Sequence, residues 1–323
     1  MTSGLVIGKF LPLHRGHQLL IETALAQVES LDVVVCHRPE QTIPGELRAA
    51  WVRELYPEAH VHVVPDICDD ENSKRWADYT REFLGRAPDV LFTSEDYGED
   101  FARYLACRHV LVDRARTRFP ISGTEIRKSP LTHLQHLAPC VRAYFIKRIC
   151  IVGAESTGTT TLARELAKHY MTTWVPEFGR TYSEEKLAEA EFMSAVSWTT
   201  NDFLHIARTQ LLHEDQAARN ANRVLICDTD ALATAIWHER YMGFWSQQVE
   251  GVSKGRHYDL YILTDCDIPF VQDGTRDGEH MRRWMTERFR HFLTEHGSRW
   301  LLASGDREAR LEVAIRAIDV LLV

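Results

Sequence analysis

The first segment of the chain that could do chemistry is GKFLPLHRGH, residues 8–17. It places His14 and His17 three positions apart with Gly16 between them. An apolar run precedes the segment and an apolar-periodic stretch follows it, so we expect a strand-to-helix turn whose free backbone N–H groups favour an anion. Three positions are close to one helical turn, so both imidazoles can face one ligand. The segment therefore predicts a polyphosphate site.

A second group of hydrogen-bond donors follows about a hundred residues later. The segment FPISGTEIR, residues 119–127, brings hydroxyl groups and a guanidinium to another expected helix start. Alone, it is an ordinary helix cap. Combined with the first segment, it indicates a nucleotide-phosphate site.

The third segment, GAESTGTT, residues 153–160, differs from the Walker A pattern G-x-x-x-x-G-K-[ST] at one position, where Thr159 replaces the lysine. Its glycines still allow backbone N–H groups to surround phosphates, and Thr160 can still reach Mg²⁺. The cation at the β- and γ-phosphates is missing. An active kinase must obtain that charge elsewhere, and the candidates are Arg276, Arg282, Arg283 and Lys254.

The elements that position these segments alternate between strands and helices, which predicts an α/β protein with parallel sheets and ligands at the carboxyl ends of the strands. Helices are expected over 17–28, 45–54, 76–84 and from the third segment to about 170. Strands are expected over residues 4–8, 31–36, 60–65, 89–93, 108–112, 148–153, 224–227, 258–264 and 300–303. Because the strand–helix pattern starts again at 148–153, we place the domains at 1–146 and 147–323.

Composition excludes several classes of protein. The 323 residues have a formal net charge of −8, which argues against duplex DNA as a partner. The seven cysteines form no C-x-x-C pair, so we expect reduced thiols and a cytoplasmic protein. No apolar run approaches the roughly 20 residues that span a bilayer, and we expect no membrane partner.

The first two segments together resemble the nucleotidyltransferase superfamily, which carries HxGH and ISxTxxR elements. With RAAWVRELYP, DVLFTSEDYGEDFARYL and VDRARTRFPISGTEIR, the chain resembles the bifunctional nicotinamide mononucleotide (NMN) adenylyltransferase/ribosylnicotinamide kinase (NadR) family. The resemblance implies a Rossmann-like nucleotidyltransferase domain that forms NAD and pyrophosphate from ATP and NMN. Trp76 or Trp51 could stack on the nicotinamide ring. The ATP contacts expected in this domain are Gly8, Lys9, Phe10, His14, Gly16, His17, Ser122, Thr124 and Arg127.

The rest of the chain resembles the kinase half of the same family through VPEFGR, ICDTD and DIPFVQDGTR. This implies a P-loop kinase-like domain that phosphorylates nicotinamide riboside with ATP and Mg²⁺. Asp228, at the end of an apolar strand, suits a metal partner beside Thr160. Glu177 and Arg180 could hold the ribose hydroxyls, with Glu177 as the base and Asp230 as its alternative. The expected ATP contacts are Gly153, Glu155, Ser156, Thr157, Gly158, Thr159, Thr160 and Arg276.

The catalytic residues expected overall are His14, His17, Arg127, Glu177 and Asp228. Four alternatives remain open at this point. The second domain could be a regulatory or structural nucleotide-binding module. The chain could be a repressor, although its first expected strand leaves no room for an N-terminal helix-turn-helix domain. The first domain could transfer the adenylyl group to another substrate, such as pantetheine phosphate or a deamidated nucleotide. The protein could also be a homo-oligomer.

Overall fold

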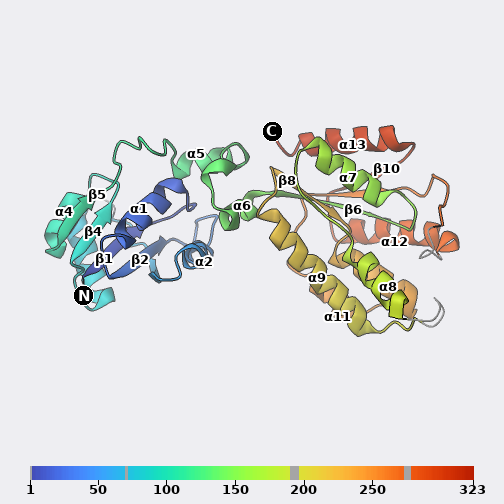
Figure 1. The fold of residues 1–323 in the computed structure, drawn as a ribbon, viewed down its shortest axis with the longest axis horizontal. Helices are drawn as coiled ribbons and strands as arrows, with labels where there is room; N and C mark the ends of the chain where they lie inside the picture. Colours follow the sequence, from blue (N-terminus) through green and yellow to red (C-terminus); the bar gives the residue numbers. More distant parts are fainter. Residues whose placement is uncertain (1, 70–71, 190–195, 273–277) are drawn as a thin grey trace. The chain divides into compact units, whose positions relative to one another are not determined.

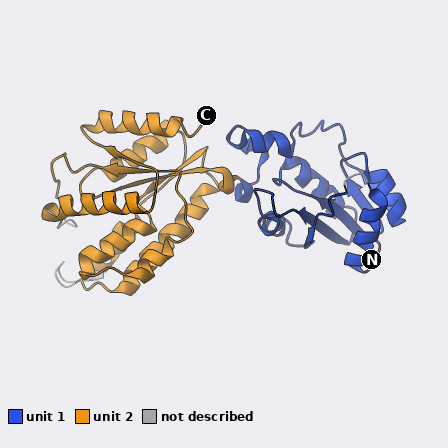
Figure 2. Ribbon diagram, turned by 180° about the vertical axis from the view of Figure 1, so that it is seen from behind, with its two compact units in different colours: residues 1–141 blue, residues 142–323 orange. Residues whose placement is uncertain are grey.

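The computed structural model describes residues 2–69, 72–189, 196–272 and 278–323. Arg276, one of the expected ATP contacts, lies outside these residues. The chain divides into two compact units, residues 1–141 and 142–323 (Figure 2). The division falls before the residue 146 expected from sequence, and helix α6 (Pro139–Phe145) spans the interval.

The first unit is built on a five-stranded sheet in which every neighbouring pair of strands is parallel. The strand order is β3-β2-β1-β4-β5, so the order reverses beside β1, the central strand (Figure 1). In sheets of this kind ligands bind where the order reverses, at the carboxyl ends of the strands. The strands are β1 (Ser3–Gly8), β2 (Ser30–His37), β3 (His60–Pro65), β4 (Val90–Thr93) and β5 (Arg108–Leu111).

Helices connect these strands and bury their apolar sides on the sheet. Helices α3 and α4 contribute Ala77, Phe101 and Leu105 to a cluster with the apolar side chains of β1 to β4. Helix α1 begins two residues earlier than expected, because the His14 side chain caps it. The helices are α1 (Arg15–Leu25), α2 (Gly45–Leu55), α3 (Ser73–Leu84), α4 (Gly98–Leu105) and α5 (Gly123–Lys128), followed by the 3-10 turns η1 (Pro130–Thr132) and η2 (Leu134–His136).

The second unit contains another five-stranded parallel sheet, with the order β10-β9-β6-β8-β7. Its central strand β6 leads directly into the glycine-rich segment. The sequence therefore predicted the α/β class and the parallel sheets of both units correctly. The strands are β6 (Lys147–Gly153), β7 (Trp174–Val175), β8 (Val224–Asp228), β9 (Leu260–Thr264) and β10 (Trp300–Ala303).

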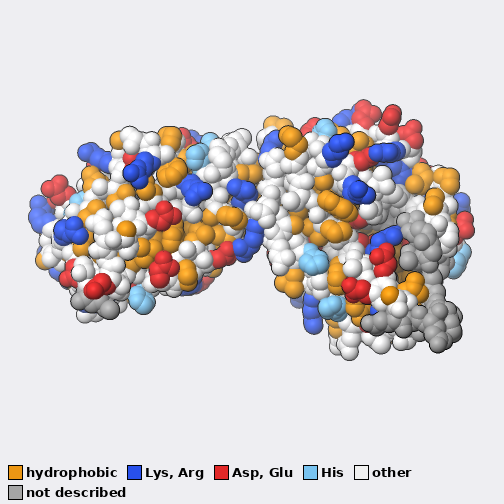
Figure 3. Space-filling view, viewed as in Figure 1, with side chains coloured by type: hydrophobic (Ala, Val, Ile, Leu, Met, Phe, Trp, Pro, Cys, Tyr) orange, Lys and Arg blue, Asp and Glu red, His pale blue; other side chains and the backbone are white. Residues whose placement is uncertain are grey.

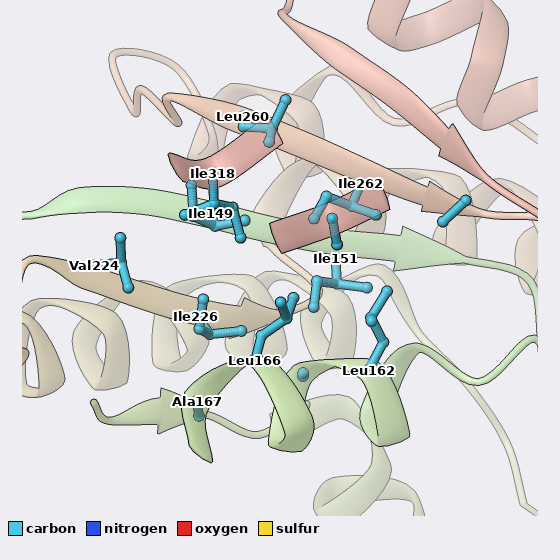
Figure 4. Packing of buried hydrophobic residues seen from close by; sticks show 13 residues of the cluster. Ile149, Ile151, Leu162, Leu166, Ala167, Val224, Ile226, Leu260, Ile262 and Ile318 are labelled. Atoms are coloured by element: carbon cyan, nitrogen blue, oxygen red, sulfur yellow. The ribbon is translucent and has the colours of Figure 1, made fainter. Parts of the chain in front are cut away.

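Helices cover both faces of this second sheet. Figure 1 shows α7 and α13 on one face and α9 and α12 on the other. Ile149, Ile151 and Ile226 of the strands meet Leu162 and Leu166 of α7 in a core without exposed side chains (Figure 4). The helices are α7 (Thr159–His169), α8 (Phe178–Glu189), α9 (Thr200–Ala218), α10 (Ala231–Met242), α11 (Gln247–Val252), α12 (Arg282–Glu295) and α13 (Arg307–Asp319), with the 3-10 turn η4 (Glu279–Met281).

The surface carries the mixture of charged and apolar residues that the composition indicates. On the face drawn in Figure 3, acidic, basic and apolar side chains are interspersed over both units. Within the described ranges, none of the helices is long and apolar enough to cross a bilayer.

Candidate nucleotide-binding sites

A pocket of about 610 Å³ lies at the carboxyl ends of β1 and β4 in the first unit. Both sequence segments expected to hold ATP line it, although more than a hundred residues separate them. All nine expected contacts lie in its wall, and they are Gly8, Lys9, Phe10, His14, Gly16, His17, Ser122, Thr124 and Arg127.

The two histidines stack on one another with ring centroids 3.8 Å apart. His14 is the N-cap of α1, and its Nδ1 accepts a hydrogen bond of 3.1 Å from the Gly16 N–H. A Cβ on Gly16 would lie 3.0 Å from the His14 ring, so glycine gives the imidazole room to cap the helix. Since Nδ1 is an acceptor, the proton of neutral His14 resides on Nε2.

Burial, with smaller contributions from Arg116 and His136, lowers the pKa of His14 to about 4. Burial also places the pKa of His17 well below its ordinary value, helped by His14 and Arg116. Both imidazoles are therefore neutral near pH 7. They can donate hydrogen bonds to phosphate oxygens, but the positive charge of the pocket comes from other side chains.

Three cationic side chains supply that charge, and one of them was not expected from sequence. Lys9 and Arg127 line the pocket as expected, and Arg116 joins them from the loop after β5. The Arg116 guanidinium pairs with Glu95 at 3.1 Å. The sequence feature that could have indicated Arg116 is the series of arginines at positions 114, 116 and 118, just before the segment 119–127.

Arg127 connects the two motifs. Its Nη1 donates to the backbone carbonyl of Leu11, and its Nη2 donates to the Thr124 hydroxyl at 3.1 Å. The Ser122 side chain caps α5 in a reciprocal arrangement with Glu125. The segment 119–127 is thus both a helix start and part of the pocket wall.

A buried arginine that sequence reasoning missed holds the backbone beneath this pocket. Arg48 on α2 has no exposed surface. Its guanidinium donates to the carbonyl of Lys9, to that of Cys36 at 3.0 Å and to that of Ile43 at 3.0 Å. The ends of β1 and β2 are therefore tied to one side chain. The sequence feature that could have indicated this role is that Arg48 falls on the apolar side of an amphipathic helix.

Of the two tryptophans proposed to stack on a ligand, only Trp76 lines the pocket. Its indole N–H donates to the Asp69 carbonyl at 3.0 Å, which fixes the ring orientation. Trp51 is 4% exposed and packs in the core, so the alternative with Trp51 was wrong. Trp51 belongs to the buried face of α2, so its ring cannot stack on a ligand.

The second site lies at the carboxyl end of β6, in a pocket of about 170 Å³. The loop between β6 and α7 needs its glycines. Gly158 has φ of +84°, and a Cβ on Gly153 would lie 2.2 Å from the Thr264 hydroxyl. The pocket is lined by the expected Gly153, Glu155, Ser156, Gly158, Thr159 and Thr160, together with Glu177, Arg180 and Asp228.

Side chains from the last part of the chain hold the glycine-rich loop in shape. The Arg310 Nη1 donates to the Thr157 carbonyl at 2.5 Å, and the Arg282 Nη2 donates to the Ser156 carbonyl at 3.2 Å. The Thr157 hydroxyl lies 2.7 Å from that of Thr264. Thr157 is 1% exposed and outside the pocket wall, so it supports the loop where a direct ATP contact was expected.

Asp228 sits at the end of β8, 2% exposed, and accepts hydrogen bonds from the hydroxyls of Thr160 and Thr159. Burial raises its pKa to about 6, and the two hydroxyls and the Arg180 charge limit the rise. A carboxylate and a hydroxyl side by side form the oxygen pair that Mg²⁺ accepts together with water and phosphate. These residues fit the ion.

Asp230, two residues further on, does not line the pocket. Its carboxylate caps α10 by accepting from the Ala233 N–H at 2.7 Å, and it accepts from the Tyr261 hydroxyl at 2.7 Å. Asp230 is fully buried. The expectation that it binds substrate or acts as base in place of Glu177 was wrong, because helix capping occupies its oxygens.

Aromatic side chains that sequence reasoning did not select form one wall of this pocket: Trp198, Phe203, Trp237 and Tyr241. The Trp198 ring lies 5.3 Å from the rings of both Phe203 and Tyr241. Trp237 and Tyr241 are four positions apart on α10 and stack at 6.3 Å. The four-residue spacing of Trp237 and Tyr241 was the sequence feature that could have indicated this wall. The same spacing is also typical of side chains that pack in a core.

Comparison with known proteins yields both a domain family and relatives that match most of the chain. A family model described as an AAA domain matches residues 148–310. The chain is 29% identical over 303 residues to the trifunctional NAD biosynthesis/regulator protein NadR of Escherichia coli (strain K12), covering 85% of this chain and 72% of that protein. The protein of the same name from Salmonella typhimurium (strain LT2) is 28% identical over 301 residues, covering 84% and 71%.

Solved structures agree on the fold. The crystal structure of a NadR protein in complex with NAD and AMP-PNP has a TM-score of 0.76 and 21% identity, covering 99% of this chain and 96% of that one. A NadR structure in complex with NR has a TM-score of 0.77 and 20% identity, covering 99% and 95%. Both units of the chain therefore share their fold with solved structures.

Proposed function

The chain belongs to the AAA-domain family and is homologous to the NadR proteins, and from this we propose that it is a nucleotide-binding enzyme of NAD synthesis with two consecutive activities. The second unit phosphorylates nicotinamide riboside to NMN, and the first unit, a Rossmann-like nucleotidyltransferase domain, transfers an adenylyl group from ATP to NMN. The observation that carries the proposal is the pocket in which His14, His17 and Arg127 meet.

In the first reaction centre, a phosphate oxygen of NMN attacks the α-phosphorus of ATP. The bond from that phosphorus to the bridging oxygen breaks, and pyrophosphate leaves. The attacking oxygen is already anionic, so positioning and stabilisation of charge are the main requirements. Neutral His14 and His17 donate hydrogen bonds to the phosphates, while Lys9, Arg116 and Arg127 supply positive charge.

Other residues of the same pocket position the two nucleotides. The backbone around Gly8, Phe10 and Gly16 approaches the phosphates, and the hydroxyls of Ser122 and Thr124 add donors at the pocket wall. Trp76 offers an aromatic face to the nicotinamide ring, whose pyridinium charge suits such a face.

In the second reaction centre, the 5′-hydroxyl oxygen of the riboside attacks the γ-phosphorus of ATP and ADP leaves. Glu177 accepts the hydroxyl proton, and Thr160 and Asp228 would hold Mg²⁺, which neutralises phosphate charge when bound. The aromatic wall of Trp198, Trp237 and Tyr241 supports a riboside with a cationic ring. The Thr160–Asp228 contact supports kinase chemistry despite the altered Walker A segment.

A second candidate function keeps adenylyl transfer alone and makes the second unit a nucleotide-binding regulatory or structural module. Thr159 at the lysine position favours it. Incubating the purified protein with ATP, Mg²⁺ and nicotinamide riboside, and following products by mass, separates the two. We expect NMN and then NAD. NAD from added NMN without any product from riboside would establish the second candidate, and no NAD from NMN would refute both.

A further inference from the structure

The glycine-rich loop of the second unit lacks its usual cation at a defined place. Thr159 occupies the first position of α7, where the Walker A lysine would stand, and its hydroxyl donates to Asp228. A threonine hydroxyl can donate a hydrogen bond but carries no charge. Phosphoryl transfer develops negative charge on the transferred group and on the leaving ADP, and cations stabilise it.

Among the described residues that line this pocket, Arg180 is the single lysine or arginine. It projects from the first turn of α8, which follows β7, whereas the glycine-rich loop follows β6. Thr160 and Asp228 line the same cavity as Arg180.

Three other arginines near the loop, all among the residues that the structure describes, make contacts that hold the fold. Arg240 pairs with Glu155 at 2.7 Å, with only 6% and 11% of the two side chains exposed. Arg282 donates to the carbonyls of Ser156 and Ile268. Arg310 donates to the carbonyl of Thr157. Among the sequence candidates, Lys254 and Arg283 do not line the described pocket.

The Arg180 side chain is 39% exposed, and its contacts include an ion pair of 4.0 Å with Glu184 on the same helix. A guanidinium can bind a phosphate group through two parallel, charge-assisted hydrogen bonds, which are stronger than hydrogen bonds between neutral groups.

We propose that Arg180 binds the β- and γ-phosphates of ATP in the second unit and supplies the positive charge that Thr159 cannot. This inference rests on the proposed kinase function and reassigns Arg180 from the ribose hydroxyls to the phosphates. Glu177, three positions earlier, remains the group beside the riboside.

The test compares Arg180→Gln with the parent protein and with Arg164→Gln, an exposed arginine of α7 outside the pocket. Calorimetric titration with AMP-PNP and with AMP, fitted to two sites because the first unit also has a proposed ATP pocket, separates the β- and γ-phosphates from the rest of the nucleotide. We expect Arg180→Gln to weaken AMP-PNP binding at least 10-fold at one of the two sites and to leave AMP binding at both sites within about twofold. Riboside phosphorylation should fall on the order of 100-fold in kcat, with little change in the riboside KM.

A second variant makes the test independent of any folding defect. Thr159→Lys, placed in the Arg180→Gln protein, restores the lysine of the usual motif and should recover at least 10-fold of the lost rate. Arg164→Gln should behave as the parent in both titrations.

The opposite results overturn the inference. A rise in the riboside KM with unchanged AMP-PNP affinity assigns Arg180 to the riboside, and equal loss of AMP and AMP-PNP binding assigns it a structural role. Failure of Thr159→Lys to recover any rate also counts against it. If the parent protein makes no NMN from riboside, the kinase proposal fails, while the two titrations still decide whether Arg180 contacts the β- and γ-phosphates.

Discussion

The guanidinium of Arg127 donates a hydrogen bond to the backbone carbonyl of Leu11, which lies in the loop between β1 and α1. The two residues are 116 positions apart. A Cβ on Gly123, near the start of the Arg127 helix, would lie 2.6 Å from the same carbonyl oxygen. The segments 8–17 and 119–127 are therefore in direct contact, and we expect a change in either to disturb the other.

Replacing both His14 and His17 by alanine should lower the rate of NAD formation from NMN and ATP at least 100-fold, because two preorganised donors are lost. Riboside phosphorylation should not change. His60→Ala, exposed at the start of β3, is the matched control. A parent-like rate in the double variant would refute the role of these histidines in adenylyl transfer.

The pH profile tests whether the histidines act in their neutral form. With the pKa of His14 at about 4, the rate of NAD formation should not fall as pH rises from about 6 to 8. If the active form were the cationic imidazole, the rate of NAD formation would instead fall as pH rises through the ordinary histidine pKa of 6.5. A decline centred there, absent from His14→Gln, would contradict the neutral form.

The same pKa shift predicts how acid affects stability. In the unfolded chain His14 takes up a proton near pH 6.5, whereas in the folded protein its pKa is about 4. The unfolded state therefore binds more protons in this interval, and stability decreases as pH falls from 6.5 to 4, by about 3 kcal/mol for His14. Urea unfolding of parent and His14→Gln across this range measures the difference.

Asp228→Asn should stabilise the protein while it abolishes riboside phosphorylation. The pKa of Asp228 is raised to about 6 from 3.8, so the parent loses stability as pH rises through this interval. The amide cannot ionise and avoids this loss, with a gain of about 1–3 kcal/mol at pH 8. Urea unfolding below pH 4 is the internal control, because the gain should vanish there.

Arg48→Met should destabilise the first unit by about 3 kcal/mol or more, because three buried carbonyls lose a charged donor. NAD formation should also weaken, since the Lys9 carbonyl belongs to the pocket loop. The control is Arg53→Met on the same helix, where 47% of the side chain is exposed and a change below about 0.5 kcal/mol is expected. Equal effects of the two variants in thermal unfolding would exclude the proposed support.

Trp237→Ala should raise the riboside KM at least 10-fold and leave NAD formation from added NMN unchanged, because one face of the aromatic wall is lost. Trp284→Ala, 38% exposed and outside the pocket, provides the comparison. Initial rates at varied riboside concentration measure the effect. An unchanged riboside KM would place the ring of the substrate elsewhere.

The parts of the fold that the sequence predicted are those encoded by neighbouring residues. The apolar runs that became β1 and β6, and the glycine-rich loops after them, are short-range patterns with one physical solution. Thr160 and Asp228 were expected near one another because each follows an apolar strand of a parallel sheet, and the structure shows that these two strands are neighbours.

Contacts formed by chain segments far apart could not be predicted in this way. Arg48 looks like an ordinary helical arginine until β1 and β2 bring their carbonyls to it. Trp51 on α2 packs in the core and Trp76 on α3 lines the pocket, and the sequence does not show which side of its helix faces the pocket. Asp230 resembles a catalytic carboxylate in sequence, and the buried Tyr261 hydroxyl that engages it comes from a different strand.

The support of the glycine-rich loop by residues near the end of the chain has a consequence for synthesis on the ribosome. Residues 153–158 are synthesised before Thr264, Arg282 and Arg310, which hold that loop. Domains fold as units while the nascent chain grows. The glycine-rich loop of a nascent second unit therefore lacks these contacts until Arg310 has been added to the chain.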